Sequence, residues 1–299
     1  MPGTIVITGA SGFIGSRVAA HARHLPEQRL RLVAHRKPVD DGSRAPAGPV
    51  ETVPGDLSDP ASLRGLCEGA EVLIHCASQI GGPAELCRAV NTLGTEALLA
   101  EARRGGVRRV VYLSTAAVYG RGPFRAARPE ELAIAPVSET SRTRAAAEEA
   151  VLSAGGTVLR PHIVHGPGDR WVAPRMAELV KAVDGQVDGW QARMSVIDAD
   201  TLARALLATA LAPAERLTAP VYHAAHPEPE PVGTVLRAFA EAASVPWPHE
   251  RIDYAEAARR LAAQGRSTHD LDMVVTDHWF AADALWRDLA LPPGPGFTP

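Results

Sequence analysis

The sequence predicts an α/β protein built on a parallel sheet that is buried on both faces. In the first half, short apolar runs alternate with helical patterns, which is typical of βαβ units. Glycines at positions 9, 12 and 15 follow the first apolar run. The 299 residues are 46% hydrophobic, which is enough for a large core. Together these observations indicate a Rossmann-type, doubly wound parallel sheet followed by a smaller, mostly helical C-terminal lobe.

Five strands and four helices are expected in the first half. The expected strands are Thr4–Thr8, Arg29–Ala34, Glu71–Cys76, Arg109–Ser114 and Thr157–Leu159. The helices are expected to begin near Ile14, Pro60, Ala84 and Ser141. Asp59 offers a capping side chain before a proline, and glycine pairs at 105–106 and 155–156 stand where helices must stop.

The alternation is less regular beyond about residue 165, where proline-rich joints such as 227–231 separate the elements. Strands are expected near Ser195–Ile197 and Val221–His223. Helices are expected near Asp200–Leu211, Val232–Ala242, Tyr254–Ala263 and Ala281–Leu289, with Asp198 and Asp200 capping the first of them.

Charge and cysteine content exclude several classes of protein. The net charge is −3 and basic runs are short, so nucleic acid is not an expected partner. Three cysteines without a Cys-x-x-Cys pair favour a reducing, cytoplasmic location. The first residues show no basic leader, and no apolar stretch approaches ~18 residues, so neither export nor a membrane is expected.

The segment TIVITGASGFIG, residues 4–15, predicts a phosphate-binding turn. A tight turn between a strand and a helix lets phosphate oxygens approach backbone N–H groups at the helix N-terminus. An ordinary βα turn is the alternative, but it rarely needs three glycines at this spacing. The expected cofactor-binding residues here are Gly9, Ser11, Gly12, Phe13, Ile14 and Gly15.

The end of the second strand favours NADP(H) over NAD(H). An NAD site usually has an acidic residue there, about 20 residues after the glycines. This chain has His35, Arg36 and Lys37, whose positive charge suits a 2′-phosphate; a solvated basic turn is the alternative. We therefore expect an NADP-binding domain over residues 1–165, with a later contribution from about 195–225, and a mainly substrate-binding lobe over 166–299.

Six ordered motifs in the first 170 residues resemble those of the extended short-chain dehydrogenases/reductases. They are TIVITGASGFIG, PGDLSD (54–59), IHCAS (74–78), Asn91 in NTLGTEALL, VYLSTAAVYG (111–120) and RPHIVHGPG (160–168). The resemblance continues weakly in SVIDADTLARAL (195–206). It implies that further residues lie along the cofactor: Asp56 and Leu57 at the adenine, Cys76, Ala77, Ser78 and Asn91 in the groove, and Ser114, Pro161, His162 and Ile163 at the nicotinamide.

The same resemblance implies a catalytic Ser/Thr, Tyr and Lys, but this chain lacks the last two. Hydride transfer to a carbonyl leaves an alkoxide that needs a proton, which the tyrosine normally supplies. Thr115 takes the Ser/Thr position, Thr140 the tyrosine position and Arg144 the lysine position. Only two of the 31 basic residues are lysines, so Arg144 fits a general arginine preference, and a guanidinium still hydrogen-bonds a ribose. Thr140 is a far weaker acid than a phenol.

Two other side chains are candidates for the missing acid, His162 and Glu139 next to the tyrosine position. A substrate that carries a phenolic hydroxyl beside its ketone would instead bring its own proton. The chain then resembles the atypical ketoreductases of angucyclinone pathways, which act on aromatic polyketides. All five tryptophans, Trp171, Trp190, Trp247, Trp279 and Trp286, lie in the C-terminal part, where they would either suit a flat ring system or fill the core.

The expected function is therefore an NADPH-dependent ketoreductase for an aromatic ketone, as a monomer or homodimer. A non-catalytic NADP-binding sensor or scaffold is the first alternative, and a nucleotide-sugar epimerase or dehydratase is the second. No metal is expected, because the pairs at His162/His165 and His223/His226 lack a third ligand at a familiar spacing.

Overall fold

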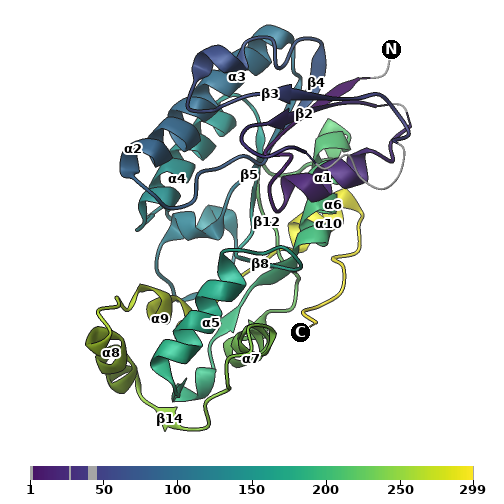
Figure 1. Cartoon of the computed structure of the whole chain (residues 1–299). Helices are drawn as coiled ribbons and strands as arrows, with labels where there is room; N and C mark the ends of the chain where they lie inside the picture. Colours follow the sequence, from purple (N-terminus) through teal and green to yellow (C-terminus); the bar gives the residue numbers. More distant parts are fainter. Residues whose placement is uncertain (1–2, 27, 40–45, 299) are drawn as a thin grey trace.

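A seven-stranded parallel sheet forms the centre of the protein, in the order β12-β7-β5-β4-β1-β2-β3 (Figure 1). The computed structural model describes residues 3–26, 28–39 and 46–298. The strands of this sheet are β1 (Thr4–Thr8), β2 (Arg29–Ala34), β3 (Val50–Pro54), β4 (Ala70–His75), β5 (Arg109–Leu113), β7 (Thr157–Arg160) and β12 (Val221–His223). All its pairings are parallel, which confirms the predicted Rossmann-type α/β fold.

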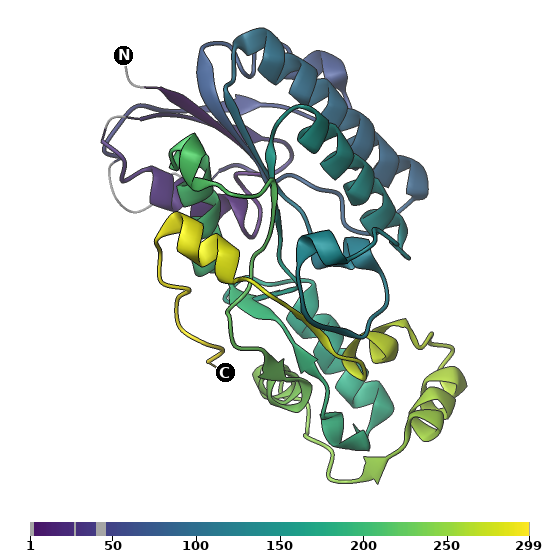
Figure 2. The ribbon, with the colours of Figure 1, turned by 180° about the vertical axis from the view of Figure 1, so that it is seen from behind.

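Alternating residues of β1 show how the two faces are covered. Ile5 and Ile7 pack in one apolar cluster with α1 (Gly15–Ala22), α6 (Ala199–Leu211) and α10 (Asp283–Leu289). Val6, between them, packs in the opposite cluster with α3 (Gly94–Gly105) and α4 (Glu139–Ser153). All three side chains are fully buried, as expected for a strand between two helical layers. Figure 2 shows α10 lying beside α6 on the first of these faces.

Most predicted elements of the first half are confirmed, with three corrections. Strand β3 was not predicted; it lies at the sheet edge, and its residues are half-buried or exposed. The helix expected at Pro60 is only the 3₁₀ turn η1 (Pro60–Leu63), capped by Asp59. Helix α4 begins at Glu139 rather than Ser141, because Ser138 caps it by accepting from the Ser141 amide. Helix α2 (Ala84–Cys87) continues through the π-helical η2 (Arg88–Leu93) into α3.

The C-terminal lobe contains helices and short strands around its own apolar core. Its helices are α5 (Val172–Val183), α7 (Val232–Ala242), α8 (Tyr254–Ala263) and α9 (His269–Val274). A four-stranded sheet is formed by β13 (Glu230–Pro231), β10 (Arg193–Met194), β15 (His278–Phe280) and β6 (Phe124–Ala127). Two strand pairs complete it: β8 (Ile163–His165) with β11 (Val196–Asp198), and β9 (Gln186–Val187) with β14 (Arg251–Ile252). The bounds of α7 and α8 agree with prediction, whereas α5, α9 and most short strands were missed. Among the described residues, no helix is both long and apolar enough to span a bilayer.

Helix α6 starts at Ala199, and Asp198 alone caps it. The Asp198 carboxylate accepts hydrogen bonds from the amides of Asp200 and Thr201 at 3.1 and 2.8 Å. The Asp200 carboxylate was expected to share this role, but it contacts the imidazole of His21 at 2.9 Å instead. Only the residue before the helix has the extended backbone that turns its side chain back onto the first amides.

Asp198→Ala is therefore expected to lower the free energy of unfolding by about 1 kcal/mol, the usual cost of losing an N-cap. Urea denaturation monitored by circular dichroism measures this change. Asp200→Ala is the matched control: it removes a solvent-exposed pair, so its cost should stay below about 0.5 kcal/mol. Equal losses in the two variants would show that Asp198 does not act as the cap.

Candidate active site

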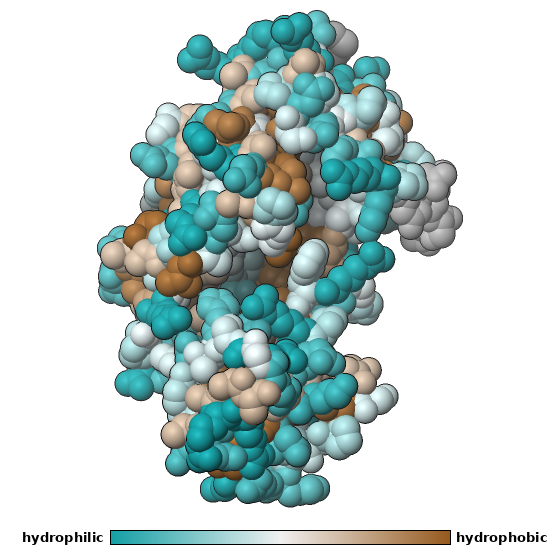
Figure 3. Space-filling model, turned by 60° about the vertical axis from the view of Figure 1, so that its left-hand side comes forward, coloured by the Kyte–Doolittle hydropathy of each residue, from teal (hydrophilic) through white to brown (hydrophobic). Residues whose placement is uncertain are grey.

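A cavity of about 630 Å³ lies where the carboxyl ends of β1, β4, β5 and β7 meet the C-terminal lobe. Gly9, Cys76, Ser114 and Pro161, which follow these four strands, all line it. Figure 3 shows the hollow between the two parts of the molecule, with hydrophobic residues inside it. This edge of a parallel sheet is where α/β proteins bind ligands.

The glycine turn leaves room for phosphates against the backbone. Gly9 has φ +67°, and a Cβ there would lie 2.8 Å from the Ala77 nitrogen. A Cβ on Gly15 would lie 2.2 Å from the Gly9 carbonyl oxygen, so only glycine lets α1 start this close to the turn. Ser11, Gly12, Phe13 and Ile14 complete this wall of the cavity. The first amides of a helix lack intrahelical acceptors, so this wall fits the pyrophosphate of a dinucleotide.

The end of the cavity near β2 carries basic and acidic side chains. His35 and Arg36 line it, and the imidazole Nε2 of His35 lies 3.0 Å from the carboxylate of Asp56. Burial opposes ionisation of Asp56, but hydrogen bonds from Ser58 and the charges of His35 and Arg36 outweigh it, so the pKa is lowered. Leu57 adds apolar surface. Lys37, predicted to bind the cofactor, is exposed and does not line the cavity.

The middle wall follows β4. Cys76, Ala77 and Ser78 line the cavity, and burial raises the pKa of the Cys76 thiol to about 12. Asn91, predicted to lie in the groove, is buried behind this wall instead. Its amide oxygen accepts from the Gln79 amide at 2.7 Å and from the Ser78 hydroxyl at 3.2 Å. Asn91 therefore holds the wall in place and does not reach the cavity.

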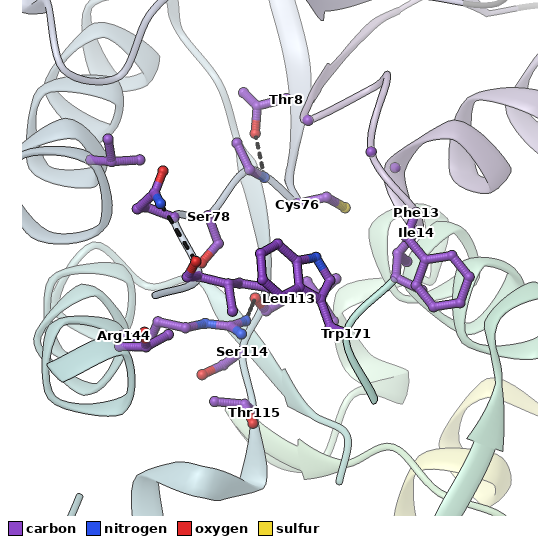
Figure 4. A pocket seen from close by; sticks show the side chains of 18 of the residues that line it. Thr8, Phe13, Ile14, Cys76, Ser78, Leu113, Ser114, Thr115, Arg144 and Trp171 are labelled. Carbon is purple, nitrogen blue, oxygen red and sulfur yellow. Dashed lines mark hydrogen bonds between the residues drawn. The ribbon is translucent and has the colours of Figure 1, made fainter. Parts of the chain in front are cut away.

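β5 and α4 form the end of the cavity that carries the residues expected to be catalytic, and we call it the reaction end. Ser114, Thr115, Thr140 and Arg144 all line the cavity there, as Figure 4 shows for the three that it labels. Arg144 reaches from α4 to donate a hydrogen bond to the carbonyl of Leu113 at 2.5 Å. The buried Ser114 Oγ and Arg144 Nε have no hydrogen-bond partner in the described part of the chain. The two threonine hydroxyls each accept a hydrogen bond from a backbone amide. Thr115 Oγ1 accepts from the Ala117 amide at 3.2 Å, and Thr140 Oγ1 accepts from the Gly81 amide at 3.0 Å.

None of the four tyrosines lines the cavity. Tyr112 is buried and stacks on His75, with ring centroids 5.1 Å apart. Its hydroxyl lies next to the Arg144 guanidinium, which favours the phenolate, but burial outweighs this and raises the pKa of Tyr112. The Tyr119 hydroxyl lies 2.7 Å from His223 Nε2 and accepts from Arg160 at 2.6 Å. Tyr222 donates to Asp288 at 2.7 Å, and Tyr254 donates to Asp272 at 2.6 Å. Thus no phenol lines the cavity, and Tyr112 lies behind Arg144.

The two proposed replacement acids are also unsuited. His162 lines the cavity, but burial, together with His278 and His223, lowers its pKa to about 3, so it is a neutral imidazole at pH 7. The Glu139 carboxylate pairs with Arg142 at 3.0 Å and does not line the cavity. Within the described ranges, no three His, Cys, Asp or Glu side chains are grouped as metal ligands.

Of the two alternatives for the five tryptophans, core filling holds for most, and Trp171 alone among them lines the cavity. Trp190 and Trp286 fill the cores of the C-terminal lobe and of the sheet domain. The substrate side of the cavity also contains Ile80, Leu86, Arg175 and Met176, none of which was predicted. Arg175 and Met176 belong to α5, a helix that was not recognised, and its amphipathic pattern was the signal available for finding them.

The parallel sheet, the glycine turn and the cavity at the strand ends define a Rossmann-type protein with a site suited to a dinucleotide. Residues 5–225 match the NAD dependent epimerase/dehydratase family, and the chain belongs to this family. This confirms the family that the ordered motifs indicated, since it comprises the extended short-chain dehydrogenases/reductases.

Similar proteins include reductases and nucleotide-sugar enzymes. The 2-alkyl-3-oxoalkanoate reductase of Stenotrophomonas maltophilia is 27% identical over 97% of this chain and 94% of its own length. A 4-hydroxy-2-methyl-3-oxo-4-farnesyl-3,4-dihydroquinoline-1-oxide ketoreductase of Stigmatella aurantiaca is 29% identical, over 58% of this chain and 54% of that protein. The structure of MoeE5 in complex with UDP-glucuronic acid and NAD has the same fold, with a TM-score of 0.74, 22% identity and 98% and 94% coverage.

Proposed function

We propose that the chain is an NADPH-dependent ketoreductase acting on an aromatic polyketide ketone of angucyclinone type, similar to the ketoreductase of the simocyclinone pathway. The observation that carries this proposal is a cavity with an intact glycine turn whose reaction end is lined by hydroxyls and a guanidinium, while no tyrosine lines it. The reductase names of two relatives support a reductive reaction. We place the protein in the cytoplasm, as a monomer or homodimer.

In the proposed mechanism the chain binds and orients its ligands but does not supply the proton. The glycine turn would hold the pyrophosphate, and Arg144 would hydrogen-bond the nicotinamide ribose. Reduced nicotinamide, when bound, supplies the hydride. Thr115 hydrogen-bonds the carbonyl oxygen of the substrate. As the carbonyl carbon gains hydride, its oxygen takes the proton of the neighbouring phenolic hydroxyl, and water then reprotonates the phenolate.

The contribution expected from positioning the reactants is larger than the contribution lost with the general acid. Holding two reactants in attack geometry contributes about 7–11 kcal/mol toward the barrier. General acid catalysis typically contributes about 10²- to 10⁴-fold in rate. A phenol on the substrate has a reference pKa near ~10, the same as that of the missing tyrosine, so it is an acid of equal strength.

The missing phenol also favours a second candidate, an NADP-binding sensor or scaffold without catalysis. Such a protein would bind NADP(H) tightly. It would bind a partner protein with only one of the two cofactor forms, NADP⁺ or NADPH, present. Nucleotide-sugar epimerisation or dehydration ranks third, although a UDP-glucose 4-epimerase of Vibrio cholerae is 27% identical over 61% of this chain. Those reactions oxidise an unactivated hydroxyl and need a base, which Thr140 cannot be.

Incubation with NADPH and an angucyclinone ketone tests the proposal. We expect loss of reduced nicotinamide that matches formation of the alcohol, as measured by absorbance and chromatography. If the protein binds NADPH tightly but turns over no hydroxylated aromatic ketone, the ketoreductase proposal is wrong and the sensor is favoured.

The proposed preference for NADP(H) depends on His35 and Arg36. Arg36→Ala removes a guanidinium that would bond the 2′-phosphate, so the ratio of the dissociation constants for NADPH and NADH should rise about 10- to 100-fold. Fluorescence titration of both cofactors measures it. Lys37→Ala is the control, because this exposed side chain does not line the cavity. An unchanged ratio in Arg36→Ala would remove the basis for the preference.

A further inference from the structure

Trp171 exposes 55% of its surface although tryptophan is among the most apolar side chains. Its backbone is held rigidly: the Asp169 carboxylate accepts from the amides of Trp171, Val172 and Ala173 at 2.8, 3.1 and 2.7 Å. Trp171 lines the cavity, and Figure 4 shows its indole among the side chains there. The fold therefore fixes the main chain and presents an open aromatic face to the cavity.

Arg175 follows Trp171 by one helical turn and lines the same cavity. Trp171 is the residue before α5 and Arg175 lies in its first turn, so the indole and the guanidinium enter the cavity from the same end of this helix. Arg175 Nε contacts both carboxylate oxygens of Asp270, at 2.7 and 2.8 Å, and Nη2 lies 2.7 Å from Oδ1. Its Nη1 has no hydrogen-bond partner among the residues that the structure describes. Asp270 thus orients the guanidinium while leaving donors free.

The sheet domain provides an apolar side chain to the same cavity. Ile80, 40% exposed, lies in the loop after β4 and lines the cavity together with Leu86. This loop is pinned by the hydrogen bond from the Gly81 amide to Thr140 Oγ1. The residue at the tyrosine position therefore has a structural role here: it holds the loop that carries Ile80.

We propose that Trp171 and Arg175 form a substrate subsite for a planar aromatic ring system that carries an oxygen acceptor. The indole stacks on the ring face, Ile80 contacts the ring system from the sheet domain, and the Arg175 guanidinium donates to a ring carbonyl or phenolate oxygen. This rests on the proposed ketoreductase function and names the side chains that select its substrate. It assigns the aromatic selectivity to Trp171, the N-cap residue of α5, and to Arg175 in the first turn of that helix.

Binding of 1,8-dihydroxyanthraquinone, a planar aromatic ketone with phenolic hydroxyls, tests the subsite. Isothermal titration is performed on the full chain, with and without saturating NADP⁺. Trp171→Ala and Arg175→Gln should each raise the dissociation constant of the probe about tenfold, whereas Trp171→Phe should stay within about threefold. The probe should quench tryptophan emission in the wild type, and this quenching should be reduced in Trp171→Phe although binding is retained.

Leu211→Ala is the matched control, because it removes an exposed apolar side chain that does not line the cavity. It should bind the probe as the wild type does. NADP⁺ affinity should be unchanged in all variants, which separates loss of the subsite from loss of the fold. Wild-type affinity in Trp171→Ala, or no binding of the probe to the wild type, overturns the subsite.

The outcome is separable from that of the proposed function. If the Trp171 and Arg175 variants lose the probe while the wild type reduces no ketone, the subsite stands and the ketoreductase proposal fails. If an angucyclinone ketone is reduced by wild type and Trp171→Ala with the same kcat/KM, the ketoreductase proposal stands and the subsite is wrong.

Discussion

With NADPH, 8-hydroxy-1-tetralone is expected to be reduced about 10²- to 10⁴-fold faster than 8-methoxy-1-tetralone, measured as kcat/KM. The two ketones differ in whether an acidic proton lies beside the carbonyl oxygen. Because no phenol of the chain lines the cavity, Tyr112 is buried behind Arg144 and Thr140 is a weak acid, the methoxy compound would have no adequate donor. The expected ratio of rates therefore equals the usual contribution of a general acid to catalysis.

The unsubstituted 1-tetralone is the control for steric hindrance. It should react as slowly as the methoxy compound, since both lack the hydroxyl. If all three ketones are reduced at similar rates, the chain or a bound water supplies the proton, and the substrate-assisted step is wrong.

The pH profile gives a second view of the same step. His162, with its pKa lowered to about 3, is already deprotonated at pH 5 and contributes no inflection between pH 5 and 8. The rate with the hydroxyl ketone should fall only as its phenol ionises, at a reference value near ~10. A loss of activity centred between pH 6 and 7 would instead indicate a histidine acid.

Loss of the Glu148 carboxylate is expected to lower the free energy of unfolding by about 3–5 kcal/mol, the largest stability effect expected here. Glu148 and Arg160 are 2% and 5% exposed, and their side chains are joined by contacts of 2.5–3.1 Å. Glu148→Ala leaves the Arg160 guanidinium buried without its carboxylate. Urea denaturation measures the change.

Two comparisons make this test specific. Glu139→Ala breaks an exposed pair with Arg142 on the same helix and should cost about 1 kcal/mol or less. Replacing both Glu148 and Arg160 with methionine should recover part of the loss, because no unpaired charge stays buried. A cost below about 1 kcal/mol for Glu148→Ala would mean that water reaches Arg160. The pair also bears on function, since Arg160 precedes Pro161 at the cavity wall.

The sequence predicts the sheet well where local patterns decide it. β1 is an apolar run, β2 carries leucines that alternate with arginines before Val33, and the glycine turn has a specific steric demand, so all three could be found without tertiary information. β3 was missed because an edge strand with half its residues exposed lacks such a run. Strands of two or three residues, such as β9 and β10, owe their existence to partners far along the chain.

The residues of the candidate site also differ in how far the sequence alone could place them. Cys76 and Ser114 were assigned from the resemblance to the family, and the structure has both of them directly after a strand, lining the cavity. The hydrogen bond between Gly81 and Thr140 joins residues 59 apart, so no local pattern reveals it. Asn91 was misplaced because its motif position does not show whether the amide faces the cavity or the wall behind it.

Transfer of deuterium tests most directly whether this cavity performs reduction. In a single turnover with NADPH deuterated at nicotinamide C4 and an angucyclinone ketone, mass spectrometry should find one deuterium at the carbinol carbon of the product. An alcohol without deuterium, or no alcohol despite bound NADPH, would contradict hydride transfer in this site.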